Sequence, residues 1–267
     1  MVFFLIFSTV INSKVLAAPE LPADHLDIIF LNVPHGEATL LTNEEEEHIL
    51  INTGSKRSQK TLYKQLKNLN VTTIKTIILT NQTEEYTGNL FYFLDHYNVE
   101  TVIKPDQIVD DAYKKVNVEK WKLDETIHLW DDVSFKALDK SKEGNISFLM
   151  QYRNESVLFL NDKDTSFEKE ILEKVTDIDI LKIADFGSGH SPSQTFLQHI
   201  DPFMSVIFQS EKHSINEALI ERLHATWIDI YFLKQSGTVF VRLSKDDYEI
   251  LTGNYYVRSW SPYNRNN

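Results

Sequence analysis

The chain has 267 residues, of which 42% are hydrophobic and 25% charged, and this length and composition predict one globular domain with a single sizeable core. Its formal net charge of −12 disfavours nucleic acid as a partner, because phosphate binding draws most of its affinity from clustered Lys and Arg. The sequence contains no cysteine, which rules out disulfides and thiolate metal ligands.

The N-terminal segment has the pattern of a signal peptide. An apolar stretch from Val2 to Val10 is too short to span a bilayer as a helix, and the small residues Ala17 and Ala18 follow it. We therefore predict a signal peptide over residues 1–18, cut after Ala17, and a secreted or extracellular protein. No Lys or Arg precedes the apolar stretch, so an uncleaved N-terminal anchor is the alternative. No later run of residues is apolar enough to cross a membrane.

Strand and helix patterns alternate along the rest of the chain. They predict a single domain over residues 24–244, followed by a C-terminal tail over residues 245–267. The acidic run from Glu44 to Glu47 is expected at the tip of an early hairpin. A helix that starts near Gly88 should carry Leu90, Phe91 and Leu94 on its inner face. The other expected helices cover 59–69, 167–175, 193–199 and 216–224, and expected strands include 76–80, 101–104, 203–208, 227–233 and 238–243. Such alternation suits a two-sheet αββα sandwich with helices on both outer faces.

The most informative segment follows the strand at 76–80 and reads Asn-Gln-Thr-Glu-Glu-Tyr-Thr-Gly. It resembles the active-site loop Thr-His-x-His-x-Asp-His-x-Gly of the metallo-β-lactamase superfamily, whose histidines and aspartate bind one or two Zn²⁺ ions. The positions of those four ligands are taken by Asn81, Thr83, Glu85 and Tyr86. No imidazole remains in the motif.

Further segments are similar, in order and spacing, to the ComEC-type branch of that superfamily, found at the end of bacterial DNA-uptake channel proteins. Residues 27–41 resemble its opening strand, Gly-Asp-Ala turn and second strand, and 49–54 resemble its Leu-Ile-Asp-Thr-Gly strand end with Asn52 in place of Asp. The hairpin that ends in a ligand Asp is matched by 145–162, with Asp162 kept. The segment Leu-Lys-x-x-His-His-Gly-Ser is matched by 181–188, with Asp185 and Phe186 in place of both histidines.

This resemblance implies a single-domain αββα metallo-β-lactamase sandwich with a degenerate metal site. Zinc is disfavoured and we expect no cofactor, since zinc affinity in this class comes largely from imidazoles. One alternative is that Glu85, Asp162 and Asp185 converge at one end of the sandwich and hold a hard cation such as Ca²⁺, Mg²⁺ or Mn²⁺. The other is that they pair with each other, with Lys or with water in a vestigial cleft. The vestigial metal-site positions are Asn81, Thr83, Glu85, Tyr86, Asp162 and Asp185.

Four more residues are candidate members of the site. His35 lies in the turn of the opening hairpin and His190 lies just past a Gly-Ser turn, and either is an alternative ligand or a general base, or else an ordinary loop histidine. Asn52 and Phe186 join them because they occupy positions of the family motifs. Ser188 lacks the Gly-x-Ser-x-Gly elbow of a nucleophile.

Three classes of function follow from this sequence. The first is a secreted protein of the metallo-β-lactamase fold that acts by binding, a pseudoenzyme without di-zinc chemistry. The second is a metal-dependent phosphodiester or ester hydrolase that uses an altered, oxygen-ligand site. The third is a cell-envelope interaction protein. The expected partner is a small molecule or a component of the cell envelope.

Overall fold

The structure is a computed structural model that describes residues 24–105, 116–244 and 248–253. The predicted signal peptide and most of the predicted tail lie outside the described residues. Within the described part of the chain, no helix is long and apolar enough to cross a membrane.

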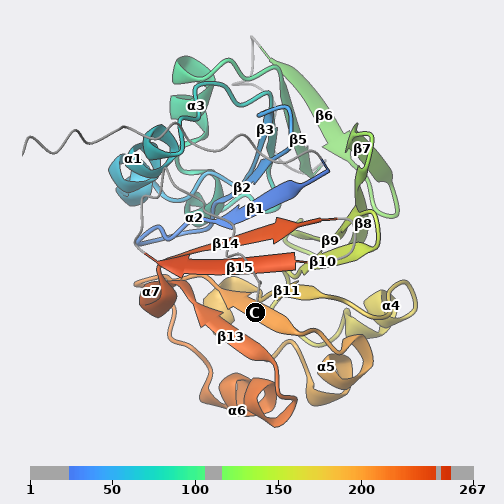
Figure 1. Cartoon of the computed structure of the whole chain (residues 1–267). Coiled ribbons are helices and arrows are strands. Elements are labelled where there is room, and N and C mark those ends of the chain that lie inside the picture. The colour runs from blue at the N-terminus through green and yellow to red at the C-terminus, as the bar shows by residue number, and fades with distance from the viewer. Residues whose placement is uncertain (1–23, 106–115, 245–247, 254–267) are drawn as a thin grey trace, which may run out of the picture.

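The first sheet has eight strands in the order β15-β14-β1-β2-β3-β4-β5-β6 (Figure 1). Neighbouring strands are antiparallel from β15 to β3, and β3 to β6 run parallel to one another. The strands are β1 (Leu26–Phe30), β2 (Thr39–Thr42), β3 (His48–Ile51), β4 (Thr76–Ile78), β5 (Thr101–Pro105), β6 (Asn117–Trp121), β14 (Thr238–Leu243) and β15 (Tyr248–Gly253).

The second sheet has seven strands in the order β13-β12-β11-β10-β9-β8-β7. Strands β7 to β10 form an antiparallel meander, and β10 to β13 run parallel. The strands are β7 (Thr126–Trp130), β8 (Val133–Lys140), β9 (Ile146–Tyr152), β10 (Glu155–Phe159), β11 (Ile180–Lys182), β12 (Met204–Ile207) and β13 (Asp229–Phe232).

Helices cover the outer faces of both sheets, and the main core lies between the sheets. The rings of Phe148 and Phe159 stack there at 4.5 Å, within a large cluster of buried apolar side chains from both sheets. Separate apolar clusters join α1 and α3 to the first sheet, and α4, α5 and α6 to the second. The predicted four-layer αββα sandwich is confirmed. The helices are η1 (Lys56–Ser58), α1 (Gln59–Asn68), α2 (Glu84–Thr87), α3 (Leu90–His96), α4 (Glu168–Leu172), η2 (Asp185–Gly187), α5 (Gln194–Ile200), α6 (Glu217–Ala225) and α7 (Leu233–Ser236).

Two expectations need correction. The inner face of α3 carries Leu90 and Phe93, whereas Phe91 is 54% exposed. Residues three positions apart share one face of a helix, as Leu90 and Phe93 do, and adjacent residues do not. The domain also continues past residue 244. Strand β15 pairs with β14 along its whole length, so part of the predicted tail belongs to the first sheet.

One buried carboxylate in the second sheet has an incomplete set of partners. Asp139 lies at an irregularity in the pairing of β8 with β9, and its Oδ2 atom has no hydrogen-bond partner. Burial, together with the negative charge of Asp162, raises the pKa of Asp139 to about 6. Between pH ~4 and pH about 6, the folded protein therefore holds a proton here that the unfolded chain has released.

We predict that Asp139→Asn stabilises the protein at neutral pH. The raised pKa means that the contribution of Asp139 to stability is present below pH ~4 and lost as pH rises through about 6, whereas the Asn side chain does not titrate. The variant should gain about 1–3 kcal/mol in free energy of unfolding at pH 7.5, and the gain should shrink towards pH 4. Urea unfolding at both pH values measures this. The exposed Asp95→Asn substitution is the control, and an equal gain there would contradict the prediction.

Candidate functional site

Loops that follow six strands meet at one edge of the sandwich. They follow β1, β4, β8, β10, β11 and β12, and four of these strands, β4 and β10 to β12, belong to the parallel parts of the two sheets. A cleft of about 380 Å³ opens at this edge. Its lining comprises Asn81, Gln82, Thr83, Glu85, Tyr86, Glu143, Asn145, Asn161, Asp162, Lys163, Asp164, Asp185, Phe186 and His213.

All six positions that the sequence assigns to a vestigial metal site belong to this lining, together with Phe186. His190 is exposed and lies outside the lining, with its backbone bonded to Lys163 and Arg222. Asn52 and His35 are buried beside the cleft rather than in it. The structure therefore brings together seven of the positions matched to the family motifs, with Asn52 buried beside them, and it separates His190 from them.

Asn52 positions the loop that carries Asn81. Its side chain accepts a hydrogen bond from the Thr80 backbone N–H at 3.0 Å and bonds to the Thr80 hydroxyl, which joins the ends of β3 and β4. The Asn81 side-chain oxygen then accepts from the backbone N–H of Thr83 at 2.8 Å. Both amides are thus used to shape the backbone, which is the common role of Asn in turns.

Backbone contacts fix the turn that carries Glu85. The Glu37 N–H donates to the Glu85 carbonyl at 3.0 Å, and the Thr53 N–H donates to the Tyr86 carbonyl at 2.7 Å. Gly36 makes this approach possible, because its φ is +99° and a Cβ atom there would lie 2.2 Å from the Glu85 carbonyl oxygen. The position of the loop therefore depends on hydrogen bonds within the chain.

The two aromatic substitutions close the floor of the cleft. Tyr86 and Phe186 are both buried, with ring centroids 5.8 Å apart, and the Tyr86 hydroxyl donates to Glu37 at 3.3 Å. Burial and the neighbouring acidic groups raise the pKa of Tyr86 well above its usual value, so the hydroxyl stays protonated. A protonated phenol facing the core is a poor metal ligand.

A buried ion pair lies beneath the cleft. Lys182, on β11 of the second sheet, donates to the Glu37 carboxylate at 2.8 Å and to the Asn161 side-chain oxygen at 2.6 Å. The side chains of Lys182 and Glu37 are 1% and 2% exposed. Burial raises the pKa of Glu37 and lowers that of Lys182, while their mutual attraction opposes both shifts. This pair links a loop of the first sheet to a strand of the second.

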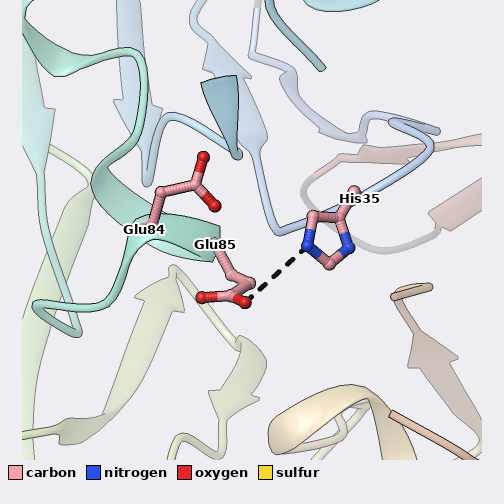
Figure 2. A group of neighbouring side chains, drawn as sticks. All are labelled: His35, Glu84 and Glu85. Carbon is pink, nitrogen blue, oxygen red and sulfur yellow. Dashed lines mark ion pairs between the residues drawn. The ribbon is translucent and has the colours of Figure 1, made fainter. Parts of the chain in front are cut away.

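Glu85 has a cation at its carboxylate. Lys212, from the loop after β12, donates to Glu85 Oε1 at 2.5 Å. The His35 ring lies beside Glu85, with Nε2 at 3.7 Å from the same oxygen (Figure 2). Burial opposes ionisation of Glu85, but the Lys212 ammonium keeps its pKa below the usual value. Glu85 is therefore a carboxylate at neutral pH.

Asp185 and Asp162 have different environments. Asp185 accepts a hydrogen bond from the Ser188 hydroxyl at 2.5 Å and has His213 Nδ1 at 3.6 Å and Lys163 Nζ at 3.9 Å. Asp162 has no cationic partner among the described residues, and burial raises its pKa. The acidic positions inherited from the motifs are thus partly neutralised by side-chain cations.

These residues do not fit the di-zinc centre that the motifs imply. Tyr86 faces the core, Phe186 offers no ligand atom, and the Glu85 carboxylate bonds to Lys212. Glu85, Asp162 and Asp185 all line the cleft, yet they are not grouped closely. In the described chain, the one set of three metal-ligating side chains with ligand atoms within 4.8 Å of each other is His35, Glu84 and Glu85.

Comparison with solved structures gives the same architecture. The metallo-β-lactamase fold protein YhfI from Bacillus subtilis matches with a TM-score of 0.61 and 8% identity, over 80% of this chain and 98% of that one. This chain has the metallo-β-lactamase fold. Zn²⁺-bound PqqB from Methylobacterium extorquens matches with a TM-score of 0.59 and 10% identity, over 78% and 97% of the two chains. A diphosphatase of the PhnP family matches with a TM-score of 0.58 and 11% identity, over 82% and 98%.

Sequence comparison points to the ComEC-type branch. The chain is 21% identical to ComE operon protein 3 of Bacillus subtilis (strain 168) over 253 residues, which cover 81% of this chain and 31% of that protein. The chain thus spans about a third of the length of this relative. No protein-family model matches the chain. Together with the fold, this similarity confirms a metallo-β-lactamase-fold protein related to ComEC-type proteins.

The sequence did not predict three charged residues of this region, which are Lys182, its partner Glu37, and Lys212. Lys182 stands inside an apolar strand, and a lysine in such a run should have predicted a buried acidic partner. Its partner Glu37 lies in a matched turn far away in the sequence. Lys212 carries no local signal, because exposed lysines are common and only the fold brings this one to Glu85.

We predict that Glu37→Gln destabilises the protein by about 2–4 kcal/mol, because it leaves the buried Lys182 without a compensating charge. The double variant Glu37→Gln with Lys182→Met should be more stable than Glu37→Gln alone, since no buried charge is then left unpaired. Urea unfolding at pH 7 of the parent, both single variants and the double variant tests this.

The exposed pair of Arg57 with Glu211 supplies the matched control, because Glu211→Gln should change stability by less than about 0.5 kcal/mol. If Glu37→Gln changes the free energy of unfolding as little as this control, the buried ion pair does not stabilise the contact between the two sheets.

Proposed function

We propose that this protein is a non-catalytic member of its fold, a pseudoenzyme that acts by binding a ligand in the cleft between the two sheets. The observation that carries the proposal is the bond between the Lys212 ammonium and the Glu85 carboxylate. The Lys163 ammonium also lies near Asp185, at 3.9 Å from its carboxylate. Positive charge that a metal centre would supply at these positions comes from the chain itself.

The lining favours a small polar ligand that carries positive charge. Among the described residues, no cationic side chain lies within ion-pair distance of Glu143, Asp162 or Asp164, which line one side of the cleft. The rings of Tyr86 and Phe186 form an apolar floor. An amine with an apolar body would place its charge against the carboxylates and its body on the rings. A negatively charged ligand, nucleic acid included, would be repelled by the same groups and by the net charge of −12.

We also propose that the protein works outside the cytoplasm, where its partner is a small molecule or a component of the cell envelope. Support comes from the apolar stretch between Val2 and Val10 and from the small residues before Pro19.

We predict that the mature protein, dialysed without chelator, carries well under one equivalent of zinc by elemental analysis. EDTA should leave Tm unchanged within about 1 °C, because no metal contributes to the stability of the folded state. Hydrolysis of an activated phosphodiester should not exceed that of the Asp162→Asn variant. Stoichiometric zinc together with a large loss of Tm in EDTA would instead support the alternative of a metal-dependent hydrolase.

The location has its own test. When the full chain is expressed in a bacterial host with an intact export pathway, the exported protein should begin at Ala18 by mass spectrometry. Recovery of the uncut chain in the membrane fraction would support the N-terminal anchor. Recovery of the uncut chain only in the cytoplasm would contradict an extracytoplasmic role.

A further inference from the structure

His35 has an unused polar atom in the protein interior. Its side chain is 1% exposed, and its Nε2 atom has no hydrogen-bond partner. The backbone around it is held firmly, since the His35 N–H donates to the Ser58 hydroxyl at 3.1 Å and the Ser58 hydroxyl donates back to the His35 carbonyl. A buried, unpaired imidazole nitrogen costs free energy unless a partner is bound, so its orientation is informative.

The unpaired nitrogen faces two carboxylates. Figure 2 shows His35 beside Glu85, with Glu84 on the same short helix, and ligand atoms of the three side chains all lie within 4.8 Å of one another. His35 Nε2 is 3.7 Å from Glu85 Oε1, which is too long for a hydrogen bond. Two ligands of one tetrahedral zinc ion lie about 3.4 Å apart, so a small movement would let both contact a metal.

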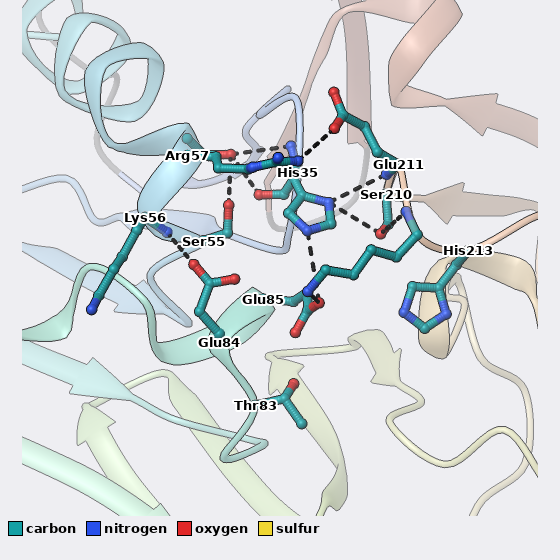
Figure 3. A network of polar contacts seen from close by, with 12 residues as sticks. His35, Ser55, Lys56, Arg57, Thr83, Glu84, Glu85, Ser210, Glu211 and His213 are labelled. Carbon is teal, nitrogen blue, oxygen red and sulfur yellow. Dashed lines mark hydrogen bonds and ion pairs between the residues drawn. The ribbon is translucent and has the colours of Figure 1, made fainter.

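The other side of the imidazole ring has the contacts that an orienting group requires. The ring lies next to the Ser210–Glu211 segment (Figure 3), and its Nδ1 is 3.1 Å from the Ser210 hydroxyl and 3.3 Å from the Glu211 backbone nitrogen. The hydroxyl both donates and accepts, so it can accept from Nδ1–H when Nε2 is used as a ligand. In that tautomer Nδ1 no longer accepts the 3.3 Å hydrogen bond from the Glu211 N–H, and this loss lowers the affinity of the site for metal.

We propose that His35, Glu84 and Glu85 form a low-affinity site for a divalent first-row transition-metal ion, and that Lys212 is a built-in competitor for it. The Lys212 side chain is 57% exposed and can leave Glu85 for solvent when a metal ion arrives. One imidazole and two carboxylates suit Zn²⁺, Mn²⁺ or Co²⁺ better than the all-oxygen preference of Ca²⁺. His35 and Glu84 are not positions of the family motif, so this site shares only Glu85 with the degenerate one.

Occupation of this site would change the cleft next to it. Glu85 and the end of the Lys212 loop both border the cleft, and His213 follows Lys212 directly. Displacement of Lys212 by a metal ion would therefore move a positive charge away from Glu85, which lines the cleft, without any change in the fold. Metal should bind at this site only when the ion is added, whether or not the protein has catalytic activity.

The test is a titration of the mature protein with Co²⁺, followed by its visible absorption, with Zn²⁺ as the competing ion. We expect one equivalent to bind to the parent protein. Lys212→Ala should bind about fivefold to tenfold more tightly, because it removes the competing cation. His35→Gln and Glu84→Gln should each weaken binding by at least about tenfold. Glu84→Gln keeps the oxygen that accepts from the Lys56 N–H, so it remains informative if His35→Gln fails to fold.

Two control variants decide whether the site is the one named. Lys163→Ala removes another lysine of the same cleft and should leave the affinity unchanged, as should Asp162→Asn at a position of the family motif. An equal gain in Lys163→Ala would show a general charge effect and overturn the competition by Lys212. If Asp162→Asn lost metal affinity and His35→Gln did not, the ion would lie at the family positions and the proposed site would be overturned. Failure of the parent to bind added metal would also overturn it, while leaving the result of elemental analysis on the dialysed protein unaffected.

Discussion

The ion pair between Glu37 and Lys182 is the interaction on which the arrangement of the site depends. It joins the loop after β1 to β11, and so fixes one sheet to the other directly beneath the cleft. Asn161 and Tyr86 complete the hydrogen bonds of the pair, which a buried ion pair needs in order to offset its desolvation. Loops from both sheets are thereby held in register by side chains of the protein itself.

Above this pair, the acidic groups of the cleft set a second constraint. Carboxylates at the edge of a low-dielectric core repel one another unless positive charge lies close by. In this chain Lys212 supplies that charge to Glu85, and Lys163 and His213 lie near Asp185. A flexible lysine is a weaker and more easily displaced partner than a metal ion held by several ligands, which leaves the cleft responsive to cations from outside.

The sequence predicted the fold well because the apolar strand pattern and the spacing of the motifs are local features. It placed β14 correctly from end to end and α1 within one residue at its C-terminal end. It missed β6 and β7, whose residues are mostly exposed or half-buried, and it also missed β8, although buried apolar residues alternate with polar ones there. It assigned β15 to a tail, because a short edge strand has little apolar signal of its own. The cleft positions were predicted as a set, but their ionic partners were not, since Lys212 meets Glu85 only through the tertiary fold.

The geometry of the turn at residues 81–86 does not depend on metal-ligating side chains. Contacts between backbone groups and small side chains hold the turn of residues 81–86, through Asn52 to Thr80, Gly36 to Glu85 and Thr53 to Tyr86. None of these contacts involves the side-chain atoms that would bind a metal. The backbone of the turn can therefore keep its shape whichever side chains stand at these positions. A preformed cleft of this kind can take a different ligand with few further changes, because the conformational entropy of its loops has already been lost on folding.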